Sequence, residues 1–229
     1  MNKQNTICAI ATATGGALGI IRVSGPEAIS IADSIFTPVG SDKRKLQERQ
    51  PYTLAFGRIT DGSGNIIDEV LISIFRAPHS YTGEDSVEIS CHGSSYILQK
   101  VMQLLMKNGC TPAAPGEYTQ RAFLNGKMDL SQAEAVADLI ASHSEASHRI
   151  AMNQMRGAFS RELAALRSQL LHLTSLMELE LDFSDHEELE FADRSELLNV
   201  ADKIRQTVSS LIGSFRVGNA IKNGVPVAI

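Results

Sequence analysis

Glu88 and His92 are the side chains in this sequence best placed to do chemistry together. Apolar and polar residues alternate from Ser86 to His92, a period of two that predicts a strand with one polar face. Both side chains then point to the same side of the strand. A carboxylate beside an imidazole suits acid–base catalysis or a metal, but two ligands are too few for zinc, and no Cys or His cluster completes a zinc site. We therefore interpret this face as a hydrogen-bonding wall for a polar ligand.

Two cations occupy positions of interest elsewhere in the chain. Arg22 interrupts the apolar run Leu18–Val23, which reads as a strand. A charged side chain is rarely buried without a partner, so Arg22 either faces solvent or forms an ion pair. Lys127 follows Gly126 in a short turn between two expected helices. Taken alone, it is an exposed lysine on that turn.

The stretch 116–140, which contains Lys127, divides the chain into two parts. Pro115-Gly116 forms a turn, a helix follows to about Leu124, and a second helix starts after Lys127, capped by Ser131 or Asp129. The sequence before this stretch predicts mixed strands and helices, whereas the sequence after it predicts helices almost to the end.

The elements expected in the first part surround the polar strand. We expect strands at 6–12 and 18–23, a helix capped by Ser24, a hairpin of 52–59 with 66–75, and a helix at 94–107. Apolar residues on both sides of strand 66–75 predict that it is central and covered on both faces.

In the second part, apolar residues recur at the spacing expected of packed helices. A Met- and Leu-rich stripe over 152–177 predicts one long helix or a pair broken near Gly157, with the stripe forming a bundle core. A last helix is expected over 195–215. We interpret the acidic segment 178–193 as a solvated connection because its spacing does not match a calcium loop.

Composition excludes several classes of protein. The chain has 229 residues, a net charge of −5 and 43% hydrophobic residues, with no apolar run of membrane-spanning length. Three cysteines, widely spaced, indicate neither a disulfide framework nor a zinc site, so we expect a cytoplasmic location. The one basic cluster, at 43–49, is interpreted as a solvated loop or helix start, so we do not expect these residues alone to hold an RNA.

Four motifs together resemble one family. They are GIIRVSG (19–25), SYTGEDSVEISCHG (80–93), PGEYTQRAFLNGKMDLSQAEAVADLI (115–140) and GAFS…LDFSDHEEL (157–189). In order and spacing they resemble the bacterial tRNA-modification GTPases of the MnmE (TrmE) family.

The resemblance implies an α+β fold in which a mixed α/β domain precedes a helical bundle domain. The first domain, 1–117, would bind tetrahydrofolate, dimerise and resemble the folate domain of the glycine-cleavage T-protein. Residues 118–217 would form the first half of the helical domain. Residues 218–229 would be a linker and the first strand (VPVAI) of a GTPase domain cut before its phosphate loop, since no GxxxxGK[ST] is present.

The resemblance also implies an activity and its participants. With the flavin-dependent partner MnmG (GidA), which carries FAD, the family adds a carboxymethylaminomethyl group to the wobble uridine, position 34, of certain tRNAs. GTP, Mg²⁺ and K⁺ would bind in the GTPase domain. A reduced folate such as 5-formyltetrahydrofolate would bind as the one-carbon donor, and the protein would form a homodimer. We accordingly expect no catalytic residue, no metal site and no GTPase activity in this chain.

Three family folate contacts fall on Arg22, Glu88 and Lys127. The 2-amino-pyrimidinone edge of a pterin offers two parallel N–H donors, which suit Glu88, and the anionic tail needs a cation. Whether Arg22 or Lys127 meets the tail is open, and Ser94 replaces a glycine found in many members. The alternatives are a free-standing one-carbon transferase of the T-protein type and a helical scaffold without a ligand.

Overall fold

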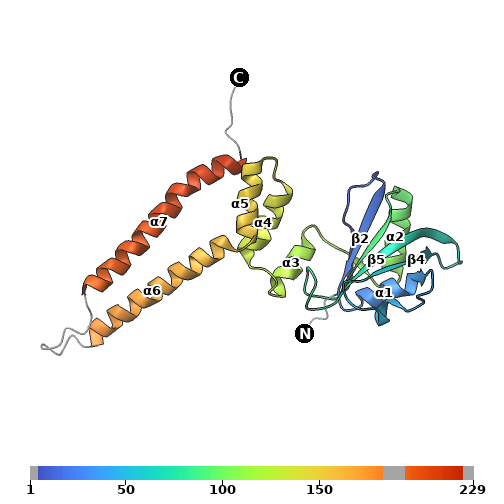
Figure 1. The fold of residues 1–229 in the computed structure, drawn as a ribbon, viewed down its shortest axis with the longest axis horizontal. Coiled ribbons are helices and arrows are strands. Elements are labelled where there is room, and N and C mark those ends of the chain that lie inside the picture. Colours follow the sequence, from blue (N-terminus) through green and yellow to red (C-terminus); the bar gives the residue numbers. More distant parts are fainter. Residues whose placement is uncertain (1–4, 183–193, 224–229) are drawn as a thin grey trace, which may run out of the picture. The chain divides into compact units, whose positions relative to one another are not determined.

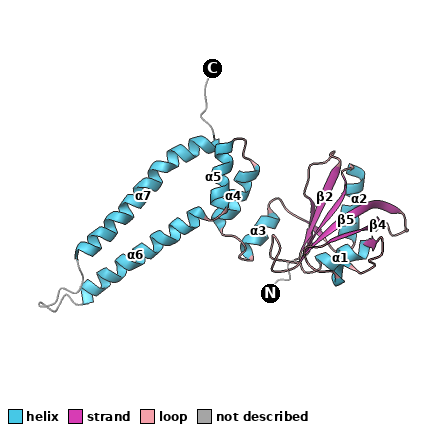
Figure 2. Ribbon diagram, viewed as in Figure 1, coloured by secondary structure: helices cyan, strands magenta, loops and turns pink. Residues whose placement is uncertain are grey.

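A computed structural model describes residues 5–182 and 194–223 of the chain. The chain divides into two compact units, Met1–Met128 and Asp129–Ile229, and each is described by itself. The first is a mixed α/β unit and the second is helical (Figures 1 and 2). This confirms the predicted fold class.

The elements of the first unit surround a single sheet. They are β1 (Ile7–Ile10), β2 (Leu18–Ser24), α1 (Ala28–Ile35), β3 (Phe36–Pro38), the 3₁₀ turn η1 (Leu46–Glu48), β4 (Leu54–Thr60), β5 (Ile66–Phe75), β6 (Ser86–His92), α2 (Ser95–Lys107), β7 (Thr111–Pro112) and α3 (Glu117–Leu124). The predicted strands, the hairpin β4–β5 and the helix α2 are all present.

The sheet has seven strands in the order β3-β4-β5-β6-β2-β1-β7. Neighbouring strands are antiparallel except β1 and β7, which are parallel. The middle strand is β6, and its register with β2 places Arg22 directly opposite Glu88. Two candidate residues that lie 66 positions apart in sequence thus become cross-strand neighbours.

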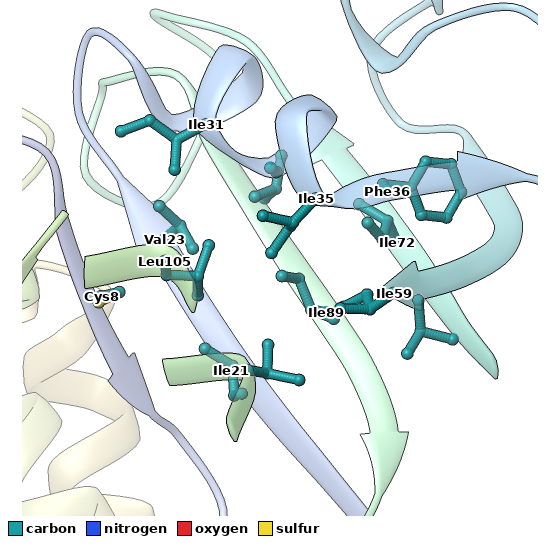
Figure 3. Close-up of a cluster of buried hydrophobic side chains, with 14 of the residues drawn as sticks. Cys8, Ile21, Val23, Ile31, Ile35, Phe36, Ile59, Ile72, Ile89 and Leu105 are labelled. Carbon is teal, nitrogen blue, oxygen red and sulfur yellow. The ribbon is translucent and has the colours of Figure 1, made fainter. Parts of the chain in front are cut away.

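The hydrophobic core lies between one face of the sheet and the helices α1 and α2. Alternate residues of the strands, such as Val23, Ile72 and Ile89, are fully buried there. Ile35 of α1 and Leu105 of α2 pack against them (Figure 3). Because strand side chains alternate between faces, this burial leaves Arg22 and Glu88 on the opposite face.

Coverage of β5 differs from the prediction. Val70, Ile72 and Ile74 are buried, but Leu71, on the other face, is 44% exposed. The prediction that both faces are covered was wrong, because α1 and α2 pack on the same face.

Ser24 does not cap α1. It is the last residue of β2, and α1 begins at Ala28 without a side-chain cap. The intervening Gly25 has a positive φ of 139° and donates its N–H to the carbonyl of Asp85, which turns the chain before the helix starts. The hydroxyl of Ser24 instead contacts Thr82 and Glu84.

Helix α3 belongs to the first unit. Tyr118 donates its hydroxyl to the carbonyl of Arg22, and Arg121 pairs with Glu84, so both side chains join α3 to the sheet unit. The predicted domain boundary follows residue 117, whereas the two compact units are divided between Met128 and Asp129.

The second unit contains α4 (Leu130–Ile140), α5 (Glu145–Met155), α6 (Ala158–Asp182) and α7 (Arg194–Asn223). Asp129 is the cap of α4 and accepts a hydrogen bond from the N–H of Gln132, which decides between the two candidate caps. The chain breaks at Gly157, whose φ is +75°, which decides for the second of the two predicted alternatives, a pair of helices. Helix α7 continues past the predicted end at residue 215.

The apolar stripe of α6 is not buried within this chain. Phe159, Leu163 and Leu170 are 42%, 45% and 46% exposed, respectively, although α6 contacts α7. The amphipathic pattern predicted the helix correctly but not its coverage. Most of the predicted acidic connection and the predicted strand at 225–229 lie outside the described residues.

Candidate ligand-binding site

An ion pair between Arg22 and Glu88 is at the centre of the candidate site. Both Nε and Nη2 of Arg22 approach the same carboxylate oxygen, Oε1, at 2.9 and 2.7 Å. The side chains remain 30% and 25% exposed, so solvent or a ligand can reach them. The second oxygen of Glu88, Oε2, takes part in neither of these contacts.

Two tyrosine rings lie beside the Arg22 guanidinium. The centroids of Tyr81 and Tyr118 are each 5.5 Å from its central carbon, within the range of cation–π attraction. The Tyr118 hydroxyl donates to the carbonyl of Arg22 at 2.7 Å, and burial raises the pKa of that hydroxyl well above its ordinary value. The Tyr81 hydroxyl pairs with that of Thr119 at 2.8 Å. The two rings and the ion pair therefore form one cluster.

Tyr81 lies in the loop between β5 and β6, and a network of polar side chains stabilises this loop. Thr82, 1% exposed, shares a 2.7 Å hydrogen bond with Ser24. Glu84 accepts from Ser24 at 2.8 Å and pairs with Arg121 of α3. Burial alone would raise the pKa of Glu117, yet hydrogen bonds from Ala114 and Arg121 lower it overall. This network fixes the loop to both β2 and α3.

Lys127 lies on the turn after α3, as predicted, and is exposed. Its Nζ donates to the carbonyl of Pro78 at 2.9 Å, at the beginning of the same β5–β6 loop. Asn125 bonds the carbonyl of Thr82 in that loop. The structure thus joins Arg22 and Glu88 directly and connects Lys127 to them through the loop.

His92 has a different partner from Glu88, although both lie on β6. Its Nδ1 is 2.7 Å from Oδ1 of Asp68, and its backbone N–H donates to Oδ2 at 2.8 Å. Asp68 is only 7% exposed, whereas the His92 ring is 68% exposed. The expected hydrogen-bonding wall is therefore two separate pairs, and Asp68 fixes the end of β6.

The site favours non-covalent recognition of a flat polar ring. A partly exposed carboxylate can accept two N–H donors, aromatic rings can stack on a planar ligand, and Arg22 and Lys127 can bind an anion. In the described residues, no three His, Cys, Asp or Glu side chains cluster as metal ligands would. Among the same residues, no helix is long and apolar enough to span a membrane.

Sequence reasoning missed Tyr81, Tyr118 and the Glu84–Arg121 pair. Loop residues such as Tyr81 have no periodicity, and the helical pattern around Tyr118 does not indicate a role in a site. The signal available was local: both tyrosines lie in the long motifs that also carry Glu88 and Lys127.

Comparison with known proteins identifies the family of the chain. Residues 6–127 match the family described as "GTP-binding protein TrmE N-terminus", and residues 130–226 match the "MnmE helical domain". The chain belongs to the MnmE (TrmE) family. The two MnmE matches meet where the two compact units of the structure meet.

Individual MnmE relatives align along almost the whole chain. It is 72% identical over 227 residues to the tRNA modification GTPase MnmE of Bacteroides thetaiotaomicron, covering 99% of this chain and 48% of the relative. It is 65% identical to the MnmE of Parabacteroides distasonis over 227 residues, which are 99% of this chain and 49% of that protein. Against the MnmE of Flavobacterium johnsoniae it is 55% identical over 230 residues, covering 100% of this chain and 48% of the relative. The chain spans about half the length of the curated relatives it matches.

Proposed function

We propose that this chain supplies the folate-binding and helical parts of a tRNA-modification GTPase. Together with MnmG (GidA) and its FAD, the protein would add a carboxymethylaminomethyl group to the wobble uridine of certain tRNAs in the cytoplasm. GTP, Mg²⁺ and K⁺ would bind a GTPase domain outside this sequence. Membership of the MnmE family supports this proposal. The match of residues 130–226 argues against a free-standing T-protein-type transferase.

The ligand we propose for the first unit is a reduced folate such as 5-formyltetrahydrofolate. The observation that carries this is the partly exposed Glu88 carboxylate beside the rings of Tyr81 and Tyr118. A carboxylate can accept two parallel hydrogen bonds from the 2-amino-pyrimidinone edge. Arg22 and Lys127 would balance the anionic tail.

We further propose that the first unit mediates a homodimer. Phe56 and Leu71 are opposite each other on β4 and β5, and with Leu54 they expose 46%, 44% and 63% of their surface on the face not covered by α1 and α2. Contiguous exposed apolar side chains are typical of interaction surfaces. A closed dimer would pair such a patch with its own copy. Light scattering should give twice the 24.8 kDa chain mass, and Leu71→Lys should shift it toward the monomer.

Calorimetric titration tests the folate proposal. Hydrogen bonds to a charged group contribute about 1.5–3 kcal/mol, so Glu88→Gln should weaken 5-formyltetrahydrofolate binding by about ten- to a hundredfold. Gln retains the size but presents an NH₂ group to a pterin donor. Glu69→Gln, in an exposed ion pair on the neighbouring strand β5, is the matched control and should leave affinity unchanged. Melting curves verify folding, and equal affinity in a folded Glu88→Gln protein would refute the assignment.

A further inference from the structure

The Arg22 guanidinium and the proposed ligand ring share one chemical pattern. A guanidinium is planar and presents adjacent N–H donors to a carboxylate. The 2-amino-4-oxo-pyrimidine edge of a pterin contains the same flat N–C–N unit, with its exocyclic amine and ring N–H as adjacent donors. In this structure, Arg22 presents its donors to Glu88 while lying beside the rings of Tyr81 and Tyr118. Arg22 thus already makes the contacts expected of the ligand.

The two groups cannot both use Glu88 fully. Nε and Nη2 of Arg22 converge on Oε1 at 2.9 and 2.7 Å. A two-donor ring edge needs both carboxylate oxygens for a bidentate contact. Bidentate binding of the ring therefore requires the guanidinium to leave Oε1.

The main chain around Arg22 is held, whereas its side chain is partly exposed. The Tyr118 hydroxyl bonds the carbonyl of Arg22, and β2 is paired on both sides, with β1 and β6. The side chain, by contrast, is 30% exposed, and Tyr81 beside it is 39% exposed. A rotamer change of Arg22 would open the site without disturbing the sheet.

We propose that Arg22 is an internal placeholder for the ligand ring: the ring displaces its guanidinium from Glu88, and the displaced Arg22 then binds the anionic tail of the same ligand. This inference rests on the proposed folate function. Displacement of Arg22 would make the site specific for the class of pterin that it binds. A neutral ring edge is a weaker partner for a carboxylate than a guanidinium, so displacement becomes favourable only when the ligand also brings an anion for Arg22. The site would then select pterins with an anionic tail over pterins without one.

Two ligands and three proteins test the placeholder. We would titrate 5-formyltetrahydrofolate and tetrahydropterin, which lacks the tail, into the wild-type chain, Arg22→Met and Arg58→Met. Arg58 forms an exposed cross-strand ion pair with Glu69 on the same sheet and is the matched control. The wild type should prefer the folate by at least about tenfold, the scale of one lost charged hydrogen bond. Arg22→Met should bind tetrahydropterin about tenfold more tightly and the folate less tightly, whereas Arg58→Met should match the wild type.

Other outcomes separate the two proposals. If the wild type binds the folate and Arg22→Met weakens both ligands by the same factor, Arg22 contacts the ring directly and is not a placeholder. Unchanged affinities in Arg22→Met would likewise overturn the inference while leaving folate binding intact. Absence of binding by every folded protein would overturn both proposals. Arg22→Gln, which retains a flat polar group, serves if Arg22→Met does not fold.

Discussion

Arg121 and Glu84 form a nearly buried ion pair in which Nη1 lies 3.2 Å from both carboxylate oxygens. Their side chains are 7% and 11% exposed. The same guanidinium also donates to Glu117 at 2.8 Å. A charge in such surroundings depends on its partner, since an unpaired buried ion is strongly unfavourable.

We expect Arg121→Met to destabilise the first unit by about 3–5 kcal/mol because it leaves Glu84 buried without its cation. Arg58→Met, which removes an exposed partner of Glu69, should cost at most about 1 kcal/mol. Urea unfolding of both variants measures the difference. Equal losses would show that burial does not distinguish the two pairs.

Stability should fall in alkaline solution because of Cys91. Burial, and then the charge of Asp68, raises the pKa of its thiol from 9.0 to about 11. The unfolded chain loses this proton near pH 9 and the folded chain near pH 11. The contribution of the thiol to the free energy of unfolding is therefore complete below pH 9 and is lost between pH 9 and pH 11.

Replacing Cys91 with Ala should reduce this pH dependence by at most about 1.4 kcal/mol per pH unit, the value for one proton. Urea unfolding at pH 7 to 11 tests the slope. Any loss of packing in Cys91→Ala lowers stability equally at all pH values. Identical slopes in the two proteins would contradict the assignment to Cys91.

Gly57 is required by the close approach of β3 to β4. A Cβ atom at this position would collide with the ring of Phe36 and with the carbonyl oxygen of Thr37. We expect Gly57→Ala to cost about 1–3 kcal/mol, as overpacked sites do. Gly62→Ala is the control, because a Cβ there meets nothing within 4 Å. Thermal melting should separate the two variants clearly.

The cap of α4 provides a test in the helical unit. Asp129 accepts from the N–H of Gln132 at 2.9 Å, and the Gln132 side chain accepts from the N–H of Asp129. Asp129→Ala should destabilise the helix by about 1 kcal/mol. Ser131→Ala should cost less, since Ser131 lies within α4. Helical circular dichroism during urea unfolding would detect the reverse order, which would refute this cap.

The sequence predicted the strands and helices, which depend on local periodicity, but missed the contacts that depend on the pairing of distant segments. Alternation around Glu88 correctly indicated its strand and its polar face. Its contact with Arg22 depends on the pairing of β2 with β6, which alternation does not specify. Tyr81 was missed because loops have no period. The exposed stripe of α6 shows a further limit: an amphipathic pattern reveals that a face is apolar, but not whether a neighbour covers it.

The parallel pairing of β1 with β7 also sets an order for folding during synthesis. The N–H of Thr111 donates to the carbonyl of Thr6 at 2.9 Å, so this contact closes a loop of roughly a hundred residues. On the ribosome, β1 is made first but must wait for β7 before its edge of the sheet is complete. Gln132 of α4, by contrast, reaches the carbonyl of Met155 over 23 residues. Low contact order favours rapid folding, so the α4–α5 pair can form soon after it is made, while the sheet unit needs its entire chain.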